Sequence, residues 1–377
     1  MGGAVGAFVA AAAMATGSAA PAKADFEELL DPIIQPLLTS VTDSLSALDP
    51  AAAVDITSWS DSLLSSLGSI DLALPSVAEP AAAAAASTAD TAAVTGGTIP
   101  LTVLEGTEPA VHASIDGGSS VPLLVDTGSA GLVIPWQDLG SGSELSDLLS
   151  LGLPSSFGES GYSGGVDYIY LTYNSLPVDY LNGGTDALST TGPVDVEVYS
   201  WDPGNLGSLF TNNAFENFLG SNDVSGILGV GDNASGPTTS PFESYGGVLV
   251  DATGKDPELI VGSSAPTGGD TVSGAPISSL YESVNGGTPL AVSDDVDSGG
   301  VYGTIPSSLT TSVPDGTVIS VYDNSAGTGT PLYSYMVEGD APTLTSGTSI
   351  DSGVEPFLQE PIYIDYTNDM MTFYPSS

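Results

Sequence analysis

Residues 121–135 constrain the fold of this chain more than any other stretch. Their sequence is VPLLVDTGSAGLVIP, in which an apolar run leads into Asp-Thr-Gly-Ser at 126–129 and a second apolar run follows. Runs so rich in β-branched and aliphatic residues predict two buried strands, and the glycine permits a tight turn between them. A carboxylate in such a place is costly if it stays unpaired. We therefore expect another part of the chain to supply a partner for Asp126.

The composition favours β structure and excludes several kinds of site. The chain has 377 residues, enough for two domains or one two-lobed domain. It contains 47 glycines and 27 prolines, which indicates many turns. It has no cysteine, so disulfides, thiolate metal sites and cysteine nucleophiles are excluded.

The charge balance is extremely acidic. Forty-six acidic residues stand against two lysines, Lys23 and Lys255, which gives a net charge of −44 at pH 7. Nucleic-acid binding through a basic patch is therefore excluded, and charge-driven docking on anionic lipid is disfavoured. The spread of the acids predicts a highly soluble surface and tolerance of acidic conditions, in which most carboxylates are neutral.

The first 97 residues divide into three segments. Residues 1–24 are small and apolar and end in Ala-Lys-Ala, the features of a secretory signal, although no positive residues precede the apolar part. Apolar residues at helical spacing over 25–75 predict a helical hairpin, which would serve as an accessory or envelope-anchoring module. The Ala/Thr/Ser-rich residues 76–97 predict an exposed linker. We expect a protein that is secreted or located at the cell envelope.

From Thr98 onward short β-type runs alternate with turn residues, and this pattern predicts one large all-β unit. Asp-(Ser/Thr)-Gly occurs three times in it, at 126–128, 297–299 and 351–353. The second copy resembles the first, because the run after it also ends at a proline, Pro306. Its approach is less regular, since Asp294 and Asp295 are unusual in a buried strand.

These motifs resemble those of pepsin-like aspartic proteases. Residues 126–135 look like the first active-site loop of that family, and 225–231 (SGILGVG) look like the segment that threads through it. Residues 258–262 resemble the start of the second lobe, and 297–300 match its aspartate loop. Residues 353–373 resemble the closing strands. The order is intact over 98–377, and VYGTIP at 301–306 most resembles the mycobacterial aspartic proteases of the PE family.

The resemblance implies a mainly β, two-lobed fold with an active-site cleft on a pseudo-twofold axis. The N-lobe is expected at 98–255 and the C-lobe at 256–377. Asp126 and Asp297 are expected to be catalytic: two such close carboxyl groups share one proton and activate a water molecule that attacks a peptide bond. The family uses no cofactor or metal, and we expect a monomer that acts on protein or peptide substrates.

The same resemblance assigns supporting roles. The side-chain hydroxyls next to the two aspartates would stabilise the loops by bonds to the backbone, and Ser129 would orient Asp126. Position 300 is glycine, so the equivalent hydroxyl after Asp297 is missing. The residues expected to support the active site are Thr127, Gly128, Ser129, Ser298 and Gly299.

Two further residues receive predictions. The resemblance to pepsin-like proteases implies a hairpin flap with a tyrosine over the substrate. Two strand-like runs around Asn174-Ser175 are the best candidate for it, with Tyr173 at the tip; alternatively, these tyrosines are ordinary cross-strand partners. Asp351 is expected to be a neighbour of Gly353, the threading glycine of the second lobe, and not a catalyst.

Other chemistries fit the sequence less well. Residues 161–165 match the Gly-x-Ser-x-Gly pattern of serine hydrolases, but the single histidine, His112, precedes the motif instead of following it. A calcium loop starting at Asp295 would place Pro306 at the twelfth position, where an acidic ligand is needed. One histidine without cysteine makes a zinc site improbable.

The sequence therefore predicts an aspartic endopeptidase that processes exported or cell-envelope proteins, including its own linker at 76–97. The alternative is a catalytically idle pepsin-like surface or binding protein. Asp294, Asp295 and Gly300 are the residues that favour this alternative.

Overall fold

The fold is mainly β throughout the residues that the computed structural model describes, all of which belong to one compact unit. The described residues are 96–140, 145–163, 165–205, 208, 211, 213–262 and 265–374. The predicted leader (1–24), helical hairpin (25–75) and nearly all of the linker (76–97) lie outside them. Within the described part, no helix is long and apolar enough to cross a membrane.

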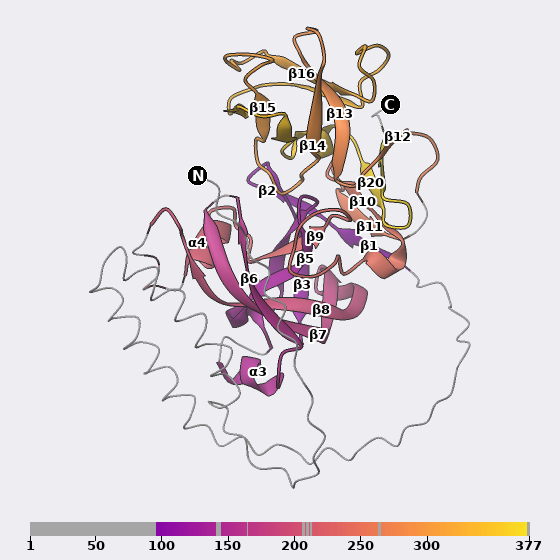
Figure 1. Ribbon diagram of the computed structural model, residues 1–377. Coiled ribbons are helices and arrows are strands. Elements are labelled where there is room, and N and C mark those ends of the chain that lie inside the picture. The colour runs from indigo at the N-terminus through magenta and orange to yellow at the C-terminus, as the bar shows by residue number, and fades with distance from the viewer. Residues whose placement is uncertain are drawn as a thin grey trace, which may run out of the picture. The chain divides into compact units, whose positions relative to one another are not determined.

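The largest sheet has eight strands and is formed by residues 102–230 (Figure 1). Its strands, in spatial order, are β2 (Thr102–Leu104), β3 (Glu108–Ile115), β4 (Val121–Asp126), β9 (Gly226–Val230), β5 (Ala130–Pro135), β8 (Thr185–Trp201), β7 (Val166–Asn182) and β6 (Ser156–Tyr162). Strand β7 also pairs with β3, so the strands from β3 to β7 form a closed ring of pairings.

Strand β9 lies between the two strands of the first Asp-Thr-Gly loop. It is parallel to β4 and antiparallel to β5. Its fit is close: a Cβ atom at Gly229 would lie 2.7 Å from backbone atoms of Ala130. Strand β5 and nearly all of β4 are buried, which explains why their sequence is a continuous apolar run and not an alternating one.

A five-stranded sheet carries the second loop. Its strands, in spatial order, are β17 (Tyr333–Met336), β16 (Val318–Tyr322), β13 (Ile277–Val284), β14 (Leu290–Asp295) and β19 (Ser349–Asp351). A small parallel pair consists of β15 (Thr304–Pro306) and β18 (Thr343–Thr345). Strand β19 is parallel to β14, as β9 is to β4, so the two loops have similar surroundings.

A six-stranded antiparallel sheet joins distant parts of the chain. Its strands, in spatial order, are β1 (Gly97–Pro100), β11 (Glu258–Val261), β10 (Gly247–Asp251), β20 (Ile362–Asp365), β21 (Met370–Phe373) and β12 (Asp270–Ser273). The predicted boundary between residues 255 and 256 falls in the connection between β10 and β11. This sheet therefore contains strands from both predicted lobes.

Helices are few among the described residues and lie between strands. They are α3 (Leu145–Ser150), α4 (Ala214–Gly220) and α5 (Glu355–Gln359), with 3-10 turns η1 (Trp136–Asp138) and η3 (Glu243–Tyr245).

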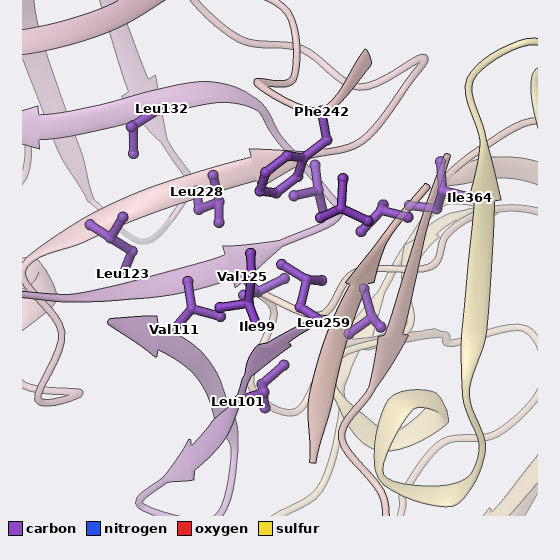
Figure 2. Packing of buried hydrophobic residues seen from close by; sticks show 14 of the residues in the cluster. Ile99, Leu101, Val111, Leu123, Val125, Leu132, Leu228, Phe242, Leu259 and Ile364 are labelled. Atoms are coloured by element: carbon purple, nitrogen blue, oxygen red, sulfur yellow. The ribbon is translucent and has the colours of Figure 1, made fainter. Parts of the chain in front are cut away.

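A large hydrophobic cluster packs the three main sheets together. Val125 and Leu228 come from the eight-stranded sheet, and Leu259 and Ile364 come from the six-stranded sheet (Figure 2). Val292 extends the cluster into the five-stranded sheet. Full burial of each such side chain stabilises the fold by about 1.5–3 kcal/mol. The strands that lead into the two aspartate loops are thus held by one common core.

Candidate active site

The two predicted aspartates lie at equivalent ends of β4 and β14. Asp126 is the last residue of β4 and is only 6% exposed, and Asp297 follows β14 by two residues. Each is followed by a turn and then by a strand that ends at a proline, β5 or β15. The two loops that the sequence paired are therefore built alike.

A reciprocal set of hydrogen bonds joins the loops through Thr127 and Ser298. The Thr127 N–H donates to the Ser298 hydroxyl (3.0 Å), and the Ser298 N–H donates to the Thr127 hydroxyl (2.8 Å). The two hydroxyls donate in turn to the carbonyls of Val296 and Val125, each at 2.6 Å. Thr127 and Ser298 are both fully buried. We call these four bonds the cross-loop network; each contributes about 1 kcal/mol.

The two loop glycines bring the carboxyl groups together. A Cβ atom at Gly128 would overlap the carboxyl group of Asp297, and one at Gly299 would lie 2.6 Å from Cγ of Asp126. Both N–H groups donate to Oδ1 of Asp297, at 3.1 Å from Gly128 and 2.7 Å from Gly299. Neither glycine has a positive φ. Glycine is needed at both positions because the opposite carboxyl group occupies the space of a side chain.

The two carboxyl groups differ in their supports. Ser129 donates to Oδ2 of Asp126 at 2.6 Å. Oδ1 of Asp126 is buried and has no hydrogen-bond donor among the described residues. An acceptor buried in this way is costly. A proton on Asp297 would supply the missing donor.

The electrostatic environment favours a single proton shared between Asp126 and Asp297. Burial raises the pKa of both carboxyl groups. The charge of Asp126 then raises the pKa of Asp297 further, well above its usual range, whereas bonds from Asp297 and Ser129 favour the ionised form of Asp126. Two carboxyl groups this close cannot both ionise at modest cost. The pair therefore holds one proton between its two carboxyl groups.

A cavity of about 490 Å³ opens in front of the pair. It is lined by both aspartate loops, by the β6–β7 hairpin and by residues of β14 and β19. Its lining includes Asp126, Gly128, Ser129, Ser160, Tyr162, Tyr168, Asp295, Asp297 and Asp351.

The predicted flap residue is not at this cavity. Tyr173 is only 6% exposed and belongs to the hydrophobic core, because β7 continues through Asn174 and Ser175 with a shift in register instead of turning there. Tyr162 and Tyr168 line the cavity in its place, on the hairpin of β6 and β7. Their rings stack with centroids 5.6 Å apart. The placement of the hairpin tip at Tyr173 is thus corrected.

The irregular aspartates before the second loop are accommodated within β14. Asp294 is fully buried and accepts a hydrogen bond from the Tyr333 hydroxyl (2.8 Å). Asp295 is partly buried and lines the cavity. Burial, the largest cause, and neighbouring carboxylates raise the pKa of Asp294 to about 7 and that of Asp295 to about 8. Both are mainly neutral in acid, which explains how a buried strand tolerates them.

The structure places Asp351 closer to the pair than the sequence predicted. It ends β19 opposite Asp295 and lines the cavity with Asp297. Burial and the charge of Asp297 raise its pKa to about 6. Asp351 is a neighbour of Gly353, as expected, since its Oδ1 accepts the Gly353 N–H at 2.7 Å. Its position at the cavity could not be seen from its spacing in the sequence.

The residues of the rejected serine-hydrolase pattern do not form a catalytic set. Ser163 lines the cavity at the hairpin, but His112 does not. His112 lies on β3, where its Nδ1 is 3.5 Å from the hydroxyl of Ser120.

Comparisons with known proteins agree with this geometry. The family described as PE-PGRS C-terminal aspartyl peptidase-like domain matches residues 97–373. PE cleavage protein A of Mycobacterium tuberculosis is 39% identical over 288 residues, which cover 72% of this chain and 50% of the relative. PE cleavage protein A of Mycobacterium marinum is 42% identical over 293 residues, with the same shares covered.

The chain thus spans about half the length of the curated relatives it matches. The match includes both aspartate loops, the strands that carry them and the six-stranded sheet. It confirms the resemblance to the PE-family aspartic proteases. The chain belongs to the PE-PGRS C-terminal aspartyl peptidase-like domain family.

Proposed function

We propose that this domain is an aspartic endopeptidase with a two-lobed, pepsin-like architecture, in which Asp126 and Asp297 activate a water molecule. The observation that carries the proposal is the mutual approach of each carboxyl group to the opposite loop glycine. A carboxyl pair of this kind has little value for the stability of the fold, because burying both groups is costly. It does match the needs of a reaction that must accept one proton and donate another.

The reaction conserves the single proton of the pair. The ionised carboxyl group takes a proton from the water, whose oxygen attacks the carbonyl carbon of the peptide bond. The protonated group gives its proton to the carbonyl oxygen, which produces a neutral intermediate with two hydroxyls. One carboxyl group then protonates the nitrogen while the other takes a hydroxyl proton, and the C–N bond breaks. The two carboxyl groups exchange the roles of acid and base between the steps.

The hairpin of β6 and β7 has the position of a flap in this mechanism. Tyr162 and Tyr168 line the cavity together with Asp126. Their aromatic surface would cover a bound peptide and exclude water from the carboxyl pair. The stack continues away from the cavity, because Tyr162 also stacks on Phe218, with centroids 6.1 Å apart.

We further propose that the substrates are exported or cell-envelope proteins, including PE proteins and the linker of the chain itself. The name of the relatives supports PE proteins as a substrate class. The signal-like residues 1–24 support a secreted or cell-envelope location. Residues 25–75 could associate the chain with the envelope. Mass analysis after mixing wild-type protein with full-length Asp126→Asn chain tests for a cut within 76–97.

A pH series with a peptide library tests the activity. We expect cleavage at acidic pH that a statine-type inhibitor blocks, and at least a 1000-fold loss, on the order of what an essential catalytic group supplies, in Asp126→Asn and in Asp297→Asn. Asp186→Asn is the matched control, since Asp186 is exposed in β8 and is not among the residues that line the cavity. Full activity in either active-site variant, or no cleavage at any pH, would refute the proposal. The second result would favour an idle binding protein.

A further inference from the structure

The two aspartate loops are not equally supported. Ser129, three residues after Asp126, donates its hydroxyl proton to that carboxylate at 2.6 Å. The residue three positions after Asp297 is Gly300, which has no side chain to offer. The difference is not forced by the backbone, because φ of Gly300 lies outside the left-handed region. The space in which a side chain of residue 300 would begin is instead occupied by another group.

That group is the carboxyl group of Asp351. A Cβ atom at Gly300 would lie 2.5 Å from Oδ1 and 2.8 Å from Oδ2 of Asp351. With contacts this short, a side chain at position 300 would require the carboxyl group of Asp351 to move. The carboxyl group thus fills the place where a serine side chain would begin.

The surroundings of Asp351 fix it in this place. Its N–H donates to the hydroxyl of Thr304 at 2.9 Å, and its Oδ1 accepts the N–H of Gly353 at 2.7 Å. Parallel pairing of β19 with β14 sets it opposite Asp295. Asp351 and Asp297 line the same cavity, and their charges interact. Hydrogen bonds to both its backbone N–H and its carboxyl group preorganise Asp351.

We propose that Asp351 is a positioning residue: while it carries a proton, its carboxyl group supports Asp297 as the hydroxyl of Ser129 supports Asp126. This inference rests on the proposed peptidase function. It assigns a third carboxyl group to the active site. Glycine at position 300 and the carboxyl group of Asp351 then act together, and Gly300 is not a defect of the second loop.

The support depends on pH because a carboxyl group can lose its proton, whereas a serine hydroxyl does not. The titratable groups facing Asp351 are Asp294 and Asp295 from β14, Asp297 from the loop and Tyr335 from β17. None of these four groups can carry a positive charge that would stabilise the ionised form of Asp351. Ionisation would replace a donor by a second negative charge beside Asp297. Activity should therefore decline as pH rises through about 6, the pKa of Asp351.

Two variants separate this role from a merely structural one. Asp351→Asn retains an oxygen for the Gly353 N–H and provides a donor that does not titrate. We expect the basic limb of its kcat/KM profile to move to higher pH than in the wild type. Asp351→Ala removes the donor, and we expect kcat to fall about tenfold at acidic pH with KM nearly unchanged.

A rescue variant makes the test stricter. In Asp351→Ala/Gly300→Ser the serine has room, because the oxygens that excluded it are gone. We expect it to recover most of the activity lost in Asp351→Ala, with a profile like that of Asp351→Asn. Wild-type pH profiles in Asp351→Asn, together with no rescue by serine, would overturn the inference while leaving the peptidase function intact.

A measurement on folding tests the inference without any activity. The unfolding temperatures of wild type, Asp297→Asn, Asp351→Asn and the double variant form a cycle at pH 5, with the full-length chain throughout. If Asp351 supports Asp297 directly, the change in unfolding temperature of the double variant should differ by about 2 °C or more from the sum of the changes in the two single variants. The departure should shrink at pH 8, where Asp351 is ionised. Additive shifts at both pH values would rule out the contact, whether or not the protein cleaves peptides.

Discussion

The hydroxyls of Thr127 and Ser298 each donate, at 2.6 Å, to the backbone carbonyl of the residue before the opposite aspartate, Val296 or Val125. Each hydroxyl also accepts the N–H of the other residue. The two aspartate loops are therefore joined at the residues that directly follow Asp126 and Asp297. A displacement of either loop must break bonds in both, so the distance between the carboxyl groups is set by the backbone.

Removing one hydroxyl of the cross-loop network should cost both stability and activity. Thr127→Val deletes one donated and one accepted bond and leaves the Ser298 N–H buried without an acceptor, so we expect a loss of about 2–4 kcal/mol in the free energy of unfolding. Urea denaturation measures it. Thr127→Ser is the control, since it retains the hydroxyl. The double variant Thr127→Val/Ser298→Ala should lose less than the sum of the single losses; simple additivity would contradict a shared network.

The loop glycines should not tolerate a methyl group. Gly128→Ala places Cβ within the carboxyl group of Asp297, so the pair must separate, and we expect a loss in kcat/KM of on the order of 100-fold or more, since such small misplacements already have effects of this size. The cost in stability should be modest, about 1–3 kcal/mol.

Peptide cleavage and thermal unfolding, measured side by side, check this prediction. Gly192→Ala is the matched control, because a Cβ atom there would meet nothing within 4 Å. A Gly128→Ala variant with normal activity would mean that the carboxyl groups do not approach each other as closely as the structure places them.

Ser129→Ala should shift the acidic limb of the pH–rate profile. The lost hydrogen bond favours the ionised form of Asp126, so its removal raises the pKa of that group. More of the enzyme is then doubly protonated in acid, and the acidic limb moves to higher pH. We expect a decrease of about tenfold in kcat/KM below the optimum. Ser129→Thr, which retains the hydroxyl, should keep the wild-type limb, and a shift to lower pH in Ser129→Ala would contradict the assignment.

The fold should be most stable in acid. Burial, with a smaller effect of a nearby carboxylate, raises the pKa of Glu197 and of Glu282 from 4.5 to about 8. Between these values the folded chain holds protons that the unfolded chain releases. The contribution of these two protonated groups to the free energy of unfolding is fully present below pH 4.5 and is lost as pH rises through about 8. The free energy of unfolding then decreases by up to about 1.4 kcal/mol per pH unit for each group.

Urea denaturation at pH 4.5, 6 and 8 measures this slope. Glu282→Gln should flatten it, whereas Glu243→Gln, at an exposed position, should leave it unchanged. A free energy of unfolding that rises from pH 4.5 to pH 8 would contradict the prediction.

The sequence predicted the first loop well because its information is local. An apolar run, a short polar turn and a second apolar run predict β4, Asp126 and β5 without knowledge of any partner. The pairing with Asp297 needed the family resemblance, since the two residues are 171 positions apart in the sequence. The role of Gly128 was understood only in part: the sequence suggested a tight turn, whereas the structure shows space taken by the opposite carboxyl group.

The hairpin and the surroundings of Asp297 depended on long-range pairing. Asn174 and Ser175 are common turn residues, but such residues also occur at a β-bulge within a long strand. Here β7 pairs with β8 on both sides of them, with a shift in register between. The proximity of Asp351 to Gly300 follows from the alignment of β19 with β14. Single-sequence patterns contain no information on such a register.

Strand β1 has a consequence for shortening the chain. It begins at Gly97 and pairs on one side with β11, so that the fully buried Ile99 lies opposite Leu259. A cut anywhere before Gly97 would detach the residues that precede it and leave every described strand pairing intact. A cut beyond Pro100 would instead remove a core side chain and expose an unpaired strand edge. Any shortening of the chain from its front therefore has a physical limit, and that limit is the first residue of β1.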